Sequence, residues 1–243
     1  MINGRSIAQR IRRSGGVGVR AASYAGPGPP LREAMPDNRK LSRVALFLAI
    51  LPLESAAAQA PPRQTSAGEY TRYELLAAGS GKFRIRYEVW ATTPGARYFF
   101  NPIRKGSIAS DEAVYDRASG RALRFEVVSG ATAQTTGLAD ADTAGSYIQV
   151  DLPHPVPNEG TVRLLIDKTY QDPKSYYEEG GNIVFARSLG IKRNAVVLPP
   201  GYELIGCNVP SQVLTEPDGR TLISFINDGP DPASLVLRAR RLP

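Results

Sequence analysis

The chain of 243 residues contains one cysteine and one histidine, and this scarcity excludes several classes of protein. With Cys207 alone, no disulfide can form within the chain, so apolar burial must hold the domain together. A zinc site usually needs several His or Cys ligands, and only His154 and Cys207 are available. We therefore expect no bound metal and no cofactor.

The lack of histidine also limits catalysis. A Ser–His–Asp triad would have to use His154, which lies in "LPHPVP" between two prolines, where an exposed turn residue is expected. The chain has no G-x-S-x-G motif. Cys207 lies in the strand-like "YELIGCNVP", which favours a buried small hydrophobe over a nucleophile. We expect no catalytic residues and a protein that is not an enzyme.

Carboxylates could still act without histidine, as in glycosidases. The adjacent pairs Asp111–Glu112 and Glu178–Glu179 do not suit this chemistry, because neighbours on a strand point to opposite faces and neighbours in loops are usually solvated. The segment "DADTAG" at Asp140 is similar to a calcium-binding loop but lacks the downstream glutamate of an EF-hand. An exported carboxylate-based hydrolase, such as a glycosidase, remains the alternative function.

Long apolar runs are scarce too, and the main one lies unusually far from Met1. Ten residues, Val44 to Leu53, form an apolar core, whereas a membrane helix needs roughly 20. Arg39, Lys40 and Arg43 precede this core, and the small residues Ala56, Ala57 and Ala58 follow it. This order is typical of a secretory signal peptide cleaved after Ala58. The alternative for Val44–Leu53 is a buried core helix.

The signal peptide sets the expected boundaries of the chain. Residues 1–34 lack periodic apolar residues and could not bury a core, so either Met35 is the true start or this segment is a disordered extension. Residues 35–58 form the signal peptide, 59–69 a flexible mature N-terminus and 70–243 the folded domain. We expect an exported protein, periplasmic or secreted.

Export also changes what the charge implies. The whole chain carries a formal net charge of +7, which by itself would suggest nucleic-acid binding. Residues 1–60 hold nine basic and three acidic residues, whereas residues 61–243 hold 21 basic and 20 acidic ones. The mature protein is therefore nearly neutral. Nucleic acid is not an expected partner, and the mature protein has no expected membrane segment.

Short runs with two-residue alternation dominate the rest of the chain. In "KFRIRYEVWA" from Lys82, Phe83 and every second residue to Val89 are apolar, while the residues between them are charged. Such runs predict half-buried antiparallel strands, and turn residues separate them. We predict an all-β, two-sheet antiparallel sandwich of roughly 10 to 13 strands. Residues 130–145, rich in Ala, Thr and Gly, are predicted to form a long surface loop.

The order of two segments resembles a known family. "SYIQVDLPHPVPNEGTVRLLIDKTY" is a strand, a Pro-rich turn and a second strand, and "NAVVLPPGYELIGCNVPSQV" leads into the hairpin strand "LISFIN". This arrangement resembles the N-terminal β-sandwich of the M1 zinc aminopeptidases, over residues 70–243. The family's chemistry lies in a later domain with an H-E-x-x-H helix, which this chain lacks. The resemblance implies a stand-alone sandwich module without its peptidase.

Basic and aromatic residues coincide at loops and strand ends, where binding residues are disproportionately found. "ARYFFNPIRKG" carries three consecutive aromatics that cannot all face one core, and "DPKSYYEEGGN" is followed by "GIKRN". Such residues are common in interfaces, although Tyr98, Phe100 and Tyr177 could instead complete the core. We predict a binding or accessory module for a protein, cell-envelope or glycan partner. The predicted binding residues are Arg104, Lys105, Tyr176, Tyr177, Lys192 and Arg193.

Overall fold

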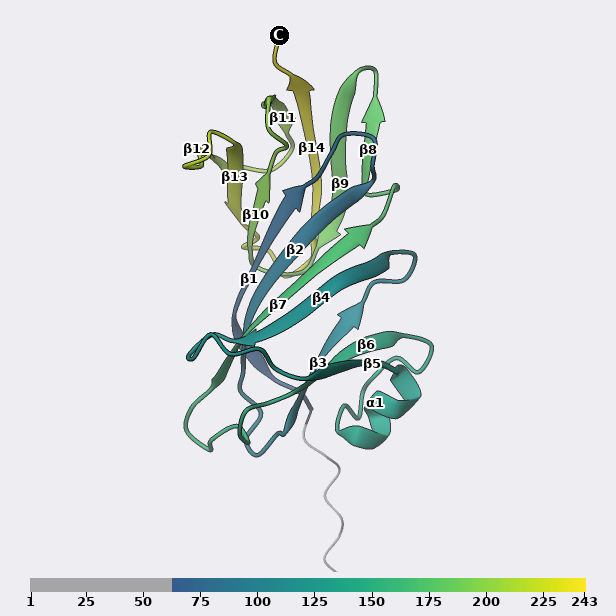
Figure 1. The fold of residues 1–243 in the computed structure, drawn as a ribbon, viewed down its shortest axis with the longest axis vertical. Helices are drawn as coiled ribbons and strands as arrows, with labels where there is room; N and C mark the ends of the chain where they lie inside the picture. The colour runs from purple at the N-terminus through teal and green to yellow at the C-terminus, as the bar shows by residue number, and fades with distance from the viewer. Residues whose placement is uncertain (1–62) are drawn as a thin grey trace, which may run out of the picture. The chain divides into compact units, whose positions relative to one another are not determined.

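Alternating sequence patterns produce fourteen strands within residues 63–243, the part of the chain that the computed structural model describes (Figure 1). The predicted signal peptide lies outside these residues. The largest sheet has the strand order β12-β13-β10-β1-β2-β7-β4. Its strands, in chain order, are β1 (Ser66–Leu75), β2 (Lys82–Ala91), β4 (Ile108–Asp116), β7 (Val162–Gln171), β10 (Arg193–Val197), β12 (Gln212–Thr215) and β13 (Thr221–Ile226).

Two smaller sheets complete the fold. A four-stranded sheet has the order β11-β14-β9-β8 and a three-stranded sheet has the order β3-β6-β5. The strands of the first are β8 (Tyr176–Glu179), β9 (Asn182–Leu189), β11 (Tyr202–Cys207) and β14 (Ala233–Arg241). Those of the second are β3 (Tyr98–Ile103), β5 (Phe125–Ser129) and β6 (Ser146–Asp151). Among the described strands, only β1 and β10 pair in parallel.

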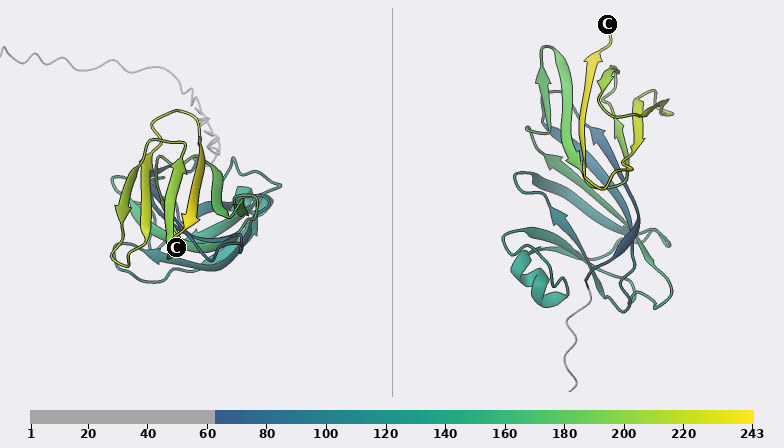
Figure 2. Two further views of the ribbon diagram at one scale, coloured as in Figure 1. Left: turned by 90° about the horizontal axis from the view of Figure 1, so that it is seen from above. Right: turned by 180° about the vertical axis from the view of Figure 1, so that it is seen from behind.

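Both smaller sheets pack on the same face of the seven-stranded sheet, because inward residues of all three sheets share one core. In the view from behind, the green and yellow strands of the four-stranded sheet lie in front of the blue strands of the large sheet (Figure 2). One continuous core contains Phe83 from the large sheet, Phe185 from the four-stranded sheet and Ile148 from the three-stranded sheet, each with 0% of its surface exposed. The predicted all-β sandwich is confirmed, with one more strand than the upper end of the predicted range. None of the described helices is long and apolar enough to cross a membrane.

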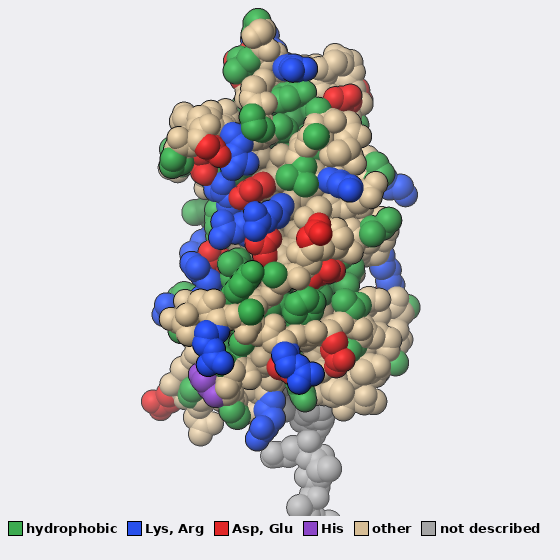
Figure 3. All heavy atoms as spheres, viewed as in Figure 1, with side chains coloured by type: hydrophobic (Ala, Val, Ile, Leu, Met, Phe, Trp, Pro, Cys, Tyr) green, Lys and Arg blue, Asp and Glu red, His purple; other side chains and the backbone are tan. Residues whose placement is uncertain are grey.

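The alternation predicted for β2 is confirmed. Phe83, Ile85, Tyr87 and Val89 are buried, whereas Lys82 and the other residues of the opposite phase are exposed or half-buried. The opposite phase forms a charged outer face, where basic and acidic side chains lie intermixed (Figure 3). Opposite charges pair across neighbouring strands, as in the 2.7 Å hydrogen bond that Arg84 Nε of β2 donates to Asp167 Oδ1 of β7. The inward-facing residues of β2 therefore all belong to the core.

The prediction of a surface loop over residues 130–145 is wrong in its first half, where α1 (Gly130–Thr136) forms. The Ser129 side chain accepts a hydrogen bond from the Thr132 backbone N–H and caps the helix. Ala133 is fully buried in a small second cluster that includes Phe100 and Tyr147. Small residues therefore allow the helix to pack closely on the three-stranded sheet.

Two further positions differ from expectation. β1 begins at Ser66, four residues before the predicted domain start, because residues 66 and 67 already pair with the end of β2. Cys207 is half-buried rather than buried, and packs against the edge of the core. His154 is exposed after β6, as expected for a turn residue.

Candidate functional site

A cleft with a volume of about 320 Å³ opens onto the inner face of the seven-stranded sheet. β1, β2 and β7 form its floor, β3 of the three-stranded sheet forms one wall, and β9 of the four-stranded sheet forms another. It therefore lies where the two smaller sheets meet over the large one. We call it the Lys168 cleft, and its lining includes Tyr73, Asn101, Arg104, Lys168, Tyr170 and Arg187.

Lys168 enters the cleft because it occupies an inward-facing position of β7. Leu164, Ile166 and Tyr170 share its phase and are buried in the core. Across the sheet, Lys168 pairs with Ile85 of β2, another core residue. The lysine is only 4% exposed. Strand alternation has thus placed a cation in a row of apolar side chains.

The ammonium of Lys168 has little polar support. Its Nζ donates to Asn101 Oδ1 at 2.5 Å and lies 5.0 Å from the centre of the Tyr170 ring. Within residues 63–243, no carboxylate oxygen lies within 4.0 Å of this nitrogen. Burial, reinforced by the positive charge of Arg187, lowers the pKa of Lys168 from 10.5 to about 8. At neutral pH the group is therefore a largely charged, poorly compensated cation.

Arg187 supplies a second buried cation from the opposite wall. It occupies an inward position of β9, two residues from Phe185, and its side chain is 6% exposed. Its Cζ lies 5.3 Å from the ring centre of Phe83 and 5.5 Å from that of Tyr170. Three aromatic rings, including Tyr73, thus surround the guanidinium. Burial lowers the pKa of Arg187, without removing its charge at neutral pH.

The charge of Arg187 is balanced by Asp172. The Arg187 Nη1 to Asp172 Oδ2 distance is 3.1 Å, and the carboxylate side chain is 9% exposed. The same oxygen accepts from the Ser175 hydroxyl at 2.7 Å and from the Ser107 hydroxyl at 3.2 Å. Burial alone would raise the pKa of Asp172, but the hydrogen bonds from Ser175 and Ser107, together with Arg187, lower it. Asp172 is therefore fully engaged, and Lys168 remains without a counterion.

A β-bulge in β4 lies opposite Lys168. Its register shifts between Ser110 and Ala113, which face Thr169 and Asp167 of β7. Asp111 within the bulge has a φ of 54°, in the left-handed region. Bulges re-aim side chains and occur often beside functional sites. Glu112, also in the bulge, is half-buried.

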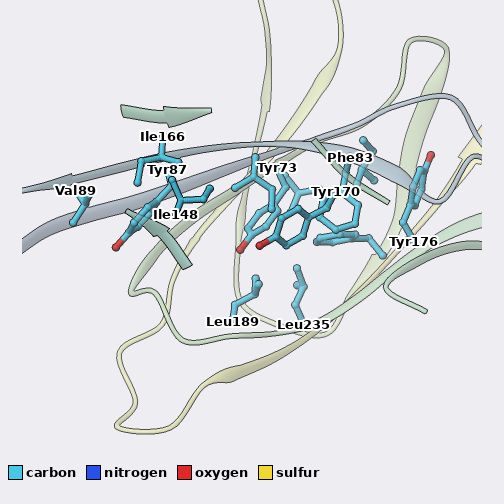
Figure 4. Close-up of a cluster of buried hydrophobic side chains, with 14 of the residues drawn as sticks. Tyr73, Phe83, Tyr87, Val89, Ile148, Ile166, Tyr170, Tyr176, Leu189 and Leu235 are labelled. Atoms are coloured by element: carbon cyan, nitrogen blue, oxygen red, sulfur yellow. The ribbon is translucent and has the colours of Figure 1, made fainter. Parts of the chain in front are cut away.

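The remaining cleft lining is amphipathic. Tyr73 and Tyr170 lie side by side with their hydroxyl oxygens directed the same way (Figure 4), and burial raises the pKa of both hydroxyls. Glu69 is the one carboxylate among the described residues that line the cleft. Its Oε1 accepts from the Tyr87 hydroxyl at 2.9 Å and from the Ser66 hydroxyl at 2.8 Å. The cleft thus combines aromatic surface, hydroxyl donors and an excess of positive charge.

Two of the predicted binding residues lie at this region. Arg104 is exposed, lines the Lys168 cleft and donates to the Ser188 carbonyl at 3.3 Å. Arg104 and Lys105 also line a neighbouring cleft of about 370 Å³. Lys105 forms an exposed ion pair with Asp142 at 2.9 Å. Their role in binding stays a prediction.

The other predicted residues are placed differently. Lys192 is exposed next to Ile191, which lines the cleft, and Arg193 is exposed at the start of β10. Arg193 Nε donates to the Glu69 carbonyl at 3.0 Å. The prediction that Tyr176 lies on an exposed loop is wrong. This residue lies in β8 and is 1% exposed, and its hydroxyl donates to the Leu76 carbonyl at 3.0 Å.

Tyr177 is half-buried on the same strand, and neither tyrosine lines the cleft. The predicted residues therefore do not form one common surface. Burial removes Tyr176 from any contact surface, since strand alternation turns it into the core.

Carboxylate pairs suited to hydrolysis are not found in the Lys168 cleft. Elsewhere within residues 63–243, Asp116 and Asp167 line one shallow pocket on the outer face. Asp167 is bound by Arg84, and Asp116 accepts from backbone N–H groups of residues 118 and 119. The described residues contain no group of three or more His, Cys, Asp or Glu that could hold a metal ion.

These features define the chain as an all-β sandwich with an amphipathic, basic cleft. No protein-family model matches the chain, and no curated protein sequence matches it. Among solved structures, it is similar to an M1 zinc metallopeptidase from Deinococcus radiodurans, with 14% identity and a TM-score of 0.42, over 74% of this chain and 43% of that chain. It is also similar to an aminopeptidase N family protein from Idiomarina loihiensis, with 9% identity and a TM-score of 0.42, over 71% of this chain and 29% of that chain.

The first of these proteins is a member of the family that the sequence resembles. The chain spans less than half the length of either protein. The function proposed below is derived from this chain's own residues.

Proposed function

We propose that this protein is an exported, non-enzymatic binding module that takes up part of a ligand or partner in the Lys168 cleft. One observation carries the proposal: a concave site on a rigid sandwich joins aromatic rings to two buried cations, Lys168 and Arg187. Ligand sites are typically concave and mostly apolar, with a few placed polar groups. The cleft volume of about 320 Å³ lies at the lower end of the range for ligand sites, which is about 300–1,000 Å³.

Binding is favoured over hydrolysis by the chemistry of the lining. A glycosidase needs two carboxylates that flank the scissile bond, and Glu69 is the one carboxylate among the described residues of the cleft. Tyr87 and Ser66 already donate to it. The cations and tyrosines can instead orient a bound group without breaking a bond.

The exported location is part of the proposal and is supported by the sequence of residues 39–58. A basic lead-in, a short apolar core and small residues up to Ala58 fit a cleaved signal peptide. We expect the exported protein to begin at Gln59, as read by N-terminal sequencing. An exported protein that retains Val44–Leu53 would contradict this part of the proposal.

Blocking the cleft should abolish ligand binding without unfolding the protein. Ile191 is half-buried and lines the cleft, so an indole introduced by Ile191→Trp should fill the entrance. The measurement is NMR titration of the purified protein with benzoate, benzamide, benzylamine, glucuronate and galactose. We expect at least one probe to shift amide signals of β1, β2 and β7 in the wild type and not in the variant.

The matched control is Ile108→Trp, because Ile108 is 66% exposed on β4 and does not line the cleft. This variant should bind like the wild type. If no probe shifts the cleft signals of the wild-type protein, the cleft is not a ligand site and the proposed function fails.

A further inference from the structure

We infer that the group bound in the Lys168 cleft is a single carboxylate, carried on a small cyclic body and held between Lys168 and Arg187. This inference rests on the proposed function and deepens it by naming the ligand chemistry. Three features of the described residues support it: the charge balance deep in the cleft, the geometry of its donors and the apolar surface around them.

The charge balance calls for one negative charge. Deep in the cleft, Lys168 and Arg187 each carry a positive charge, and Asp172 carries the negative charge that pairs with Arg187. Glu112 attracts the Lys168 ammonium but forms no ion pair with it, so Lys168 is the buried cation of the cleft that has no paired carboxylate. An isolated buried charge is unfavourable unless it is paired, and a carboxylate brings one charge. A phosphate dianion would bring a second negative charge, which only the exposed Arg104 could balance.

The donors converge from three separate elements. Lys168 comes from the floor of the cleft, Arg187 from the β9 wall, and Arg104 from the end of the β3 wall. Lys168 has three N–H donors, and Asn101 Oδ1 takes one of them. The other two are free to bind carboxylate oxygens. Charge-assisted hydrogen bonds of this kind are the strong ones.

The surface around these donors suits a ring. Buried aromatic and aliphatic residues line the floor and the β3 wall of the cleft: Tyr73, Ile85, Tyr87, Phe99 and Tyr170. The one lining carboxylate, Glu69, is occupied by the Tyr87 and Ser66 hydroxyls, and its negative charge disfavours a second anion beside it. The carboxylate of the ligand is therefore expected at Lys168, with its ring along the aromatic floor.

A pair of isosteric probes isolates the charge. Benzoate and benzamide have nearly the same shape, but only benzoate carries a negative charge. By isothermal titration calorimetry at neutral pH, we expect benzoate to bind the purified protein at least about tenfold more tightly than benzamide, as a charge-assisted hydrogen bond implies. Glucuronate reports whether a polar ring is accepted, and inorganic phosphate reports whether any anion suffices.

Lys168→Met keeps the length of the side chain and removes its charge. We expect this variant to lose the preference for benzoate, while Lys174→Met, at an exposed lysine outside the Lys168 cleft, keeps it. Circular dichroism checks that both variants are folded. Equal binding of benzoate and benzamide by the wild type would overturn the carboxylate inference and leave the binding module standing, whereas the absence of binding by every probe overturns both.

A measurement on the wild-type protein remains informative even if Lys168→Met does not fold. Benzoate affinity should be constant up to about pH 8 and fall above it, as Lys168 loses its proton. Burial raises the pKa of the nearby hydroxyls of Tyr73, Tyr87 and Tyr170 above the ordinary value of 10, and hydrogen bonds from Ser175 and Ser107 lower the pKa of Asp172. The other charged groups around Lys168 are Arg104, Arg187, Glu69 and Glu112. A flat profile up to pH 10 would overturn the role of Lys168.

Discussion

Replacing Asp172 with alanine is expected to lower the free energy of unfolding by about 3–5 kcal/mol. The substitution leaves the Arg187 guanidinium, with its side chain only 6% exposed, without a counterion. The ring faces around it stabilise a cation only partly. The Ser175 and Ser107 hydroxyls also lose their acceptor. Chemical denaturation at neutral pH measures the effect.

An exposed ion pair provides the control for this prediction. Asp142→Ala removes the ion pair between Asp142 and Lys105. The side chain of Lys105 is 66% exposed and that of Asp142 is 56% exposed. Such surface pairs contribute about 0–1 kcal/mol. The double variant Asp172→Ala/Arg187→Met should recover part of the lost stability, because it removes the unpaired charge. A loss of less than 1 kcal/mol in Asp172→Ala would contradict a dry, closed site around Arg187.

Replacing Lys168 with methionine is expected to have the opposite effect and to stabilise the ligand-free protein by about 3 kcal/mol at neutral pH. The pKa of Lys168 is about 8 in the folded protein and 10.5 as a model value, and this difference corresponds to about 3 kcal/mol. The folded pKa is the lower one, so folding disfavours the charged form. The destabilisation is fully present below pH 8 and disappears as pH rises from 8 to 10.5.

Parallel denaturation curves of the wild type and Lys168→Met between pH 7 and pH 10.5 test this prediction. The stability difference should shrink as pH rises, because only the wild type gains stability from loss of the lysine proton. Lys82→Met, at an exposed position of β2, should change stability by less than about 0.5 kcal/mol. If Lys168→Met is less stable than the wild type at pH 7, the charged Lys168 stabilises the ligand-free fold. That result would contradict the account of Lys168 as an unpaired, ligand-binding cation.

The sequence patterns predict the strands well because alternation is a local property. The inward phase of β2 is visible in "KFRIRYEVWA", and the structure has the same residues buried. The same reasoning would have found the two central cations. Lys168 and Arg187 each fall on the apolar phase of an alternating run, in "VRLLIDKTY" and "NIVFARSL". A charged residue in phase with core residues is a sequence signal for a buried site.

The remainder of the site depends on long-range pairing, which local patterns do not encode. β3, β7 and β9 belong to three different sheets, and their meeting over the cleft follows from how the sheets stack. The sequence predicts Arg104 because basic and aromatic residues coincide at this strand end. The sequence predicts a loop at Tyr176 because β8 is only four residues long. The short helix α1 was missed because Ser129 and small residues specify it without an apolar period.

The most direct test of the account is a crystal structure of the protein grown with para-bromobenzoate. Anomalous scattering from the bromine locates the ligand independently of the protein density. We predict one ligand in the Lys168 cleft, with its ring along Tyr73 and Tyr170 and a carboxylate oxygen about 2.8 Å from Lys168 Nζ. A ligand with its carboxylate turned away from Lys168, or a cleft without ligand at saturating concentration, would contradict it.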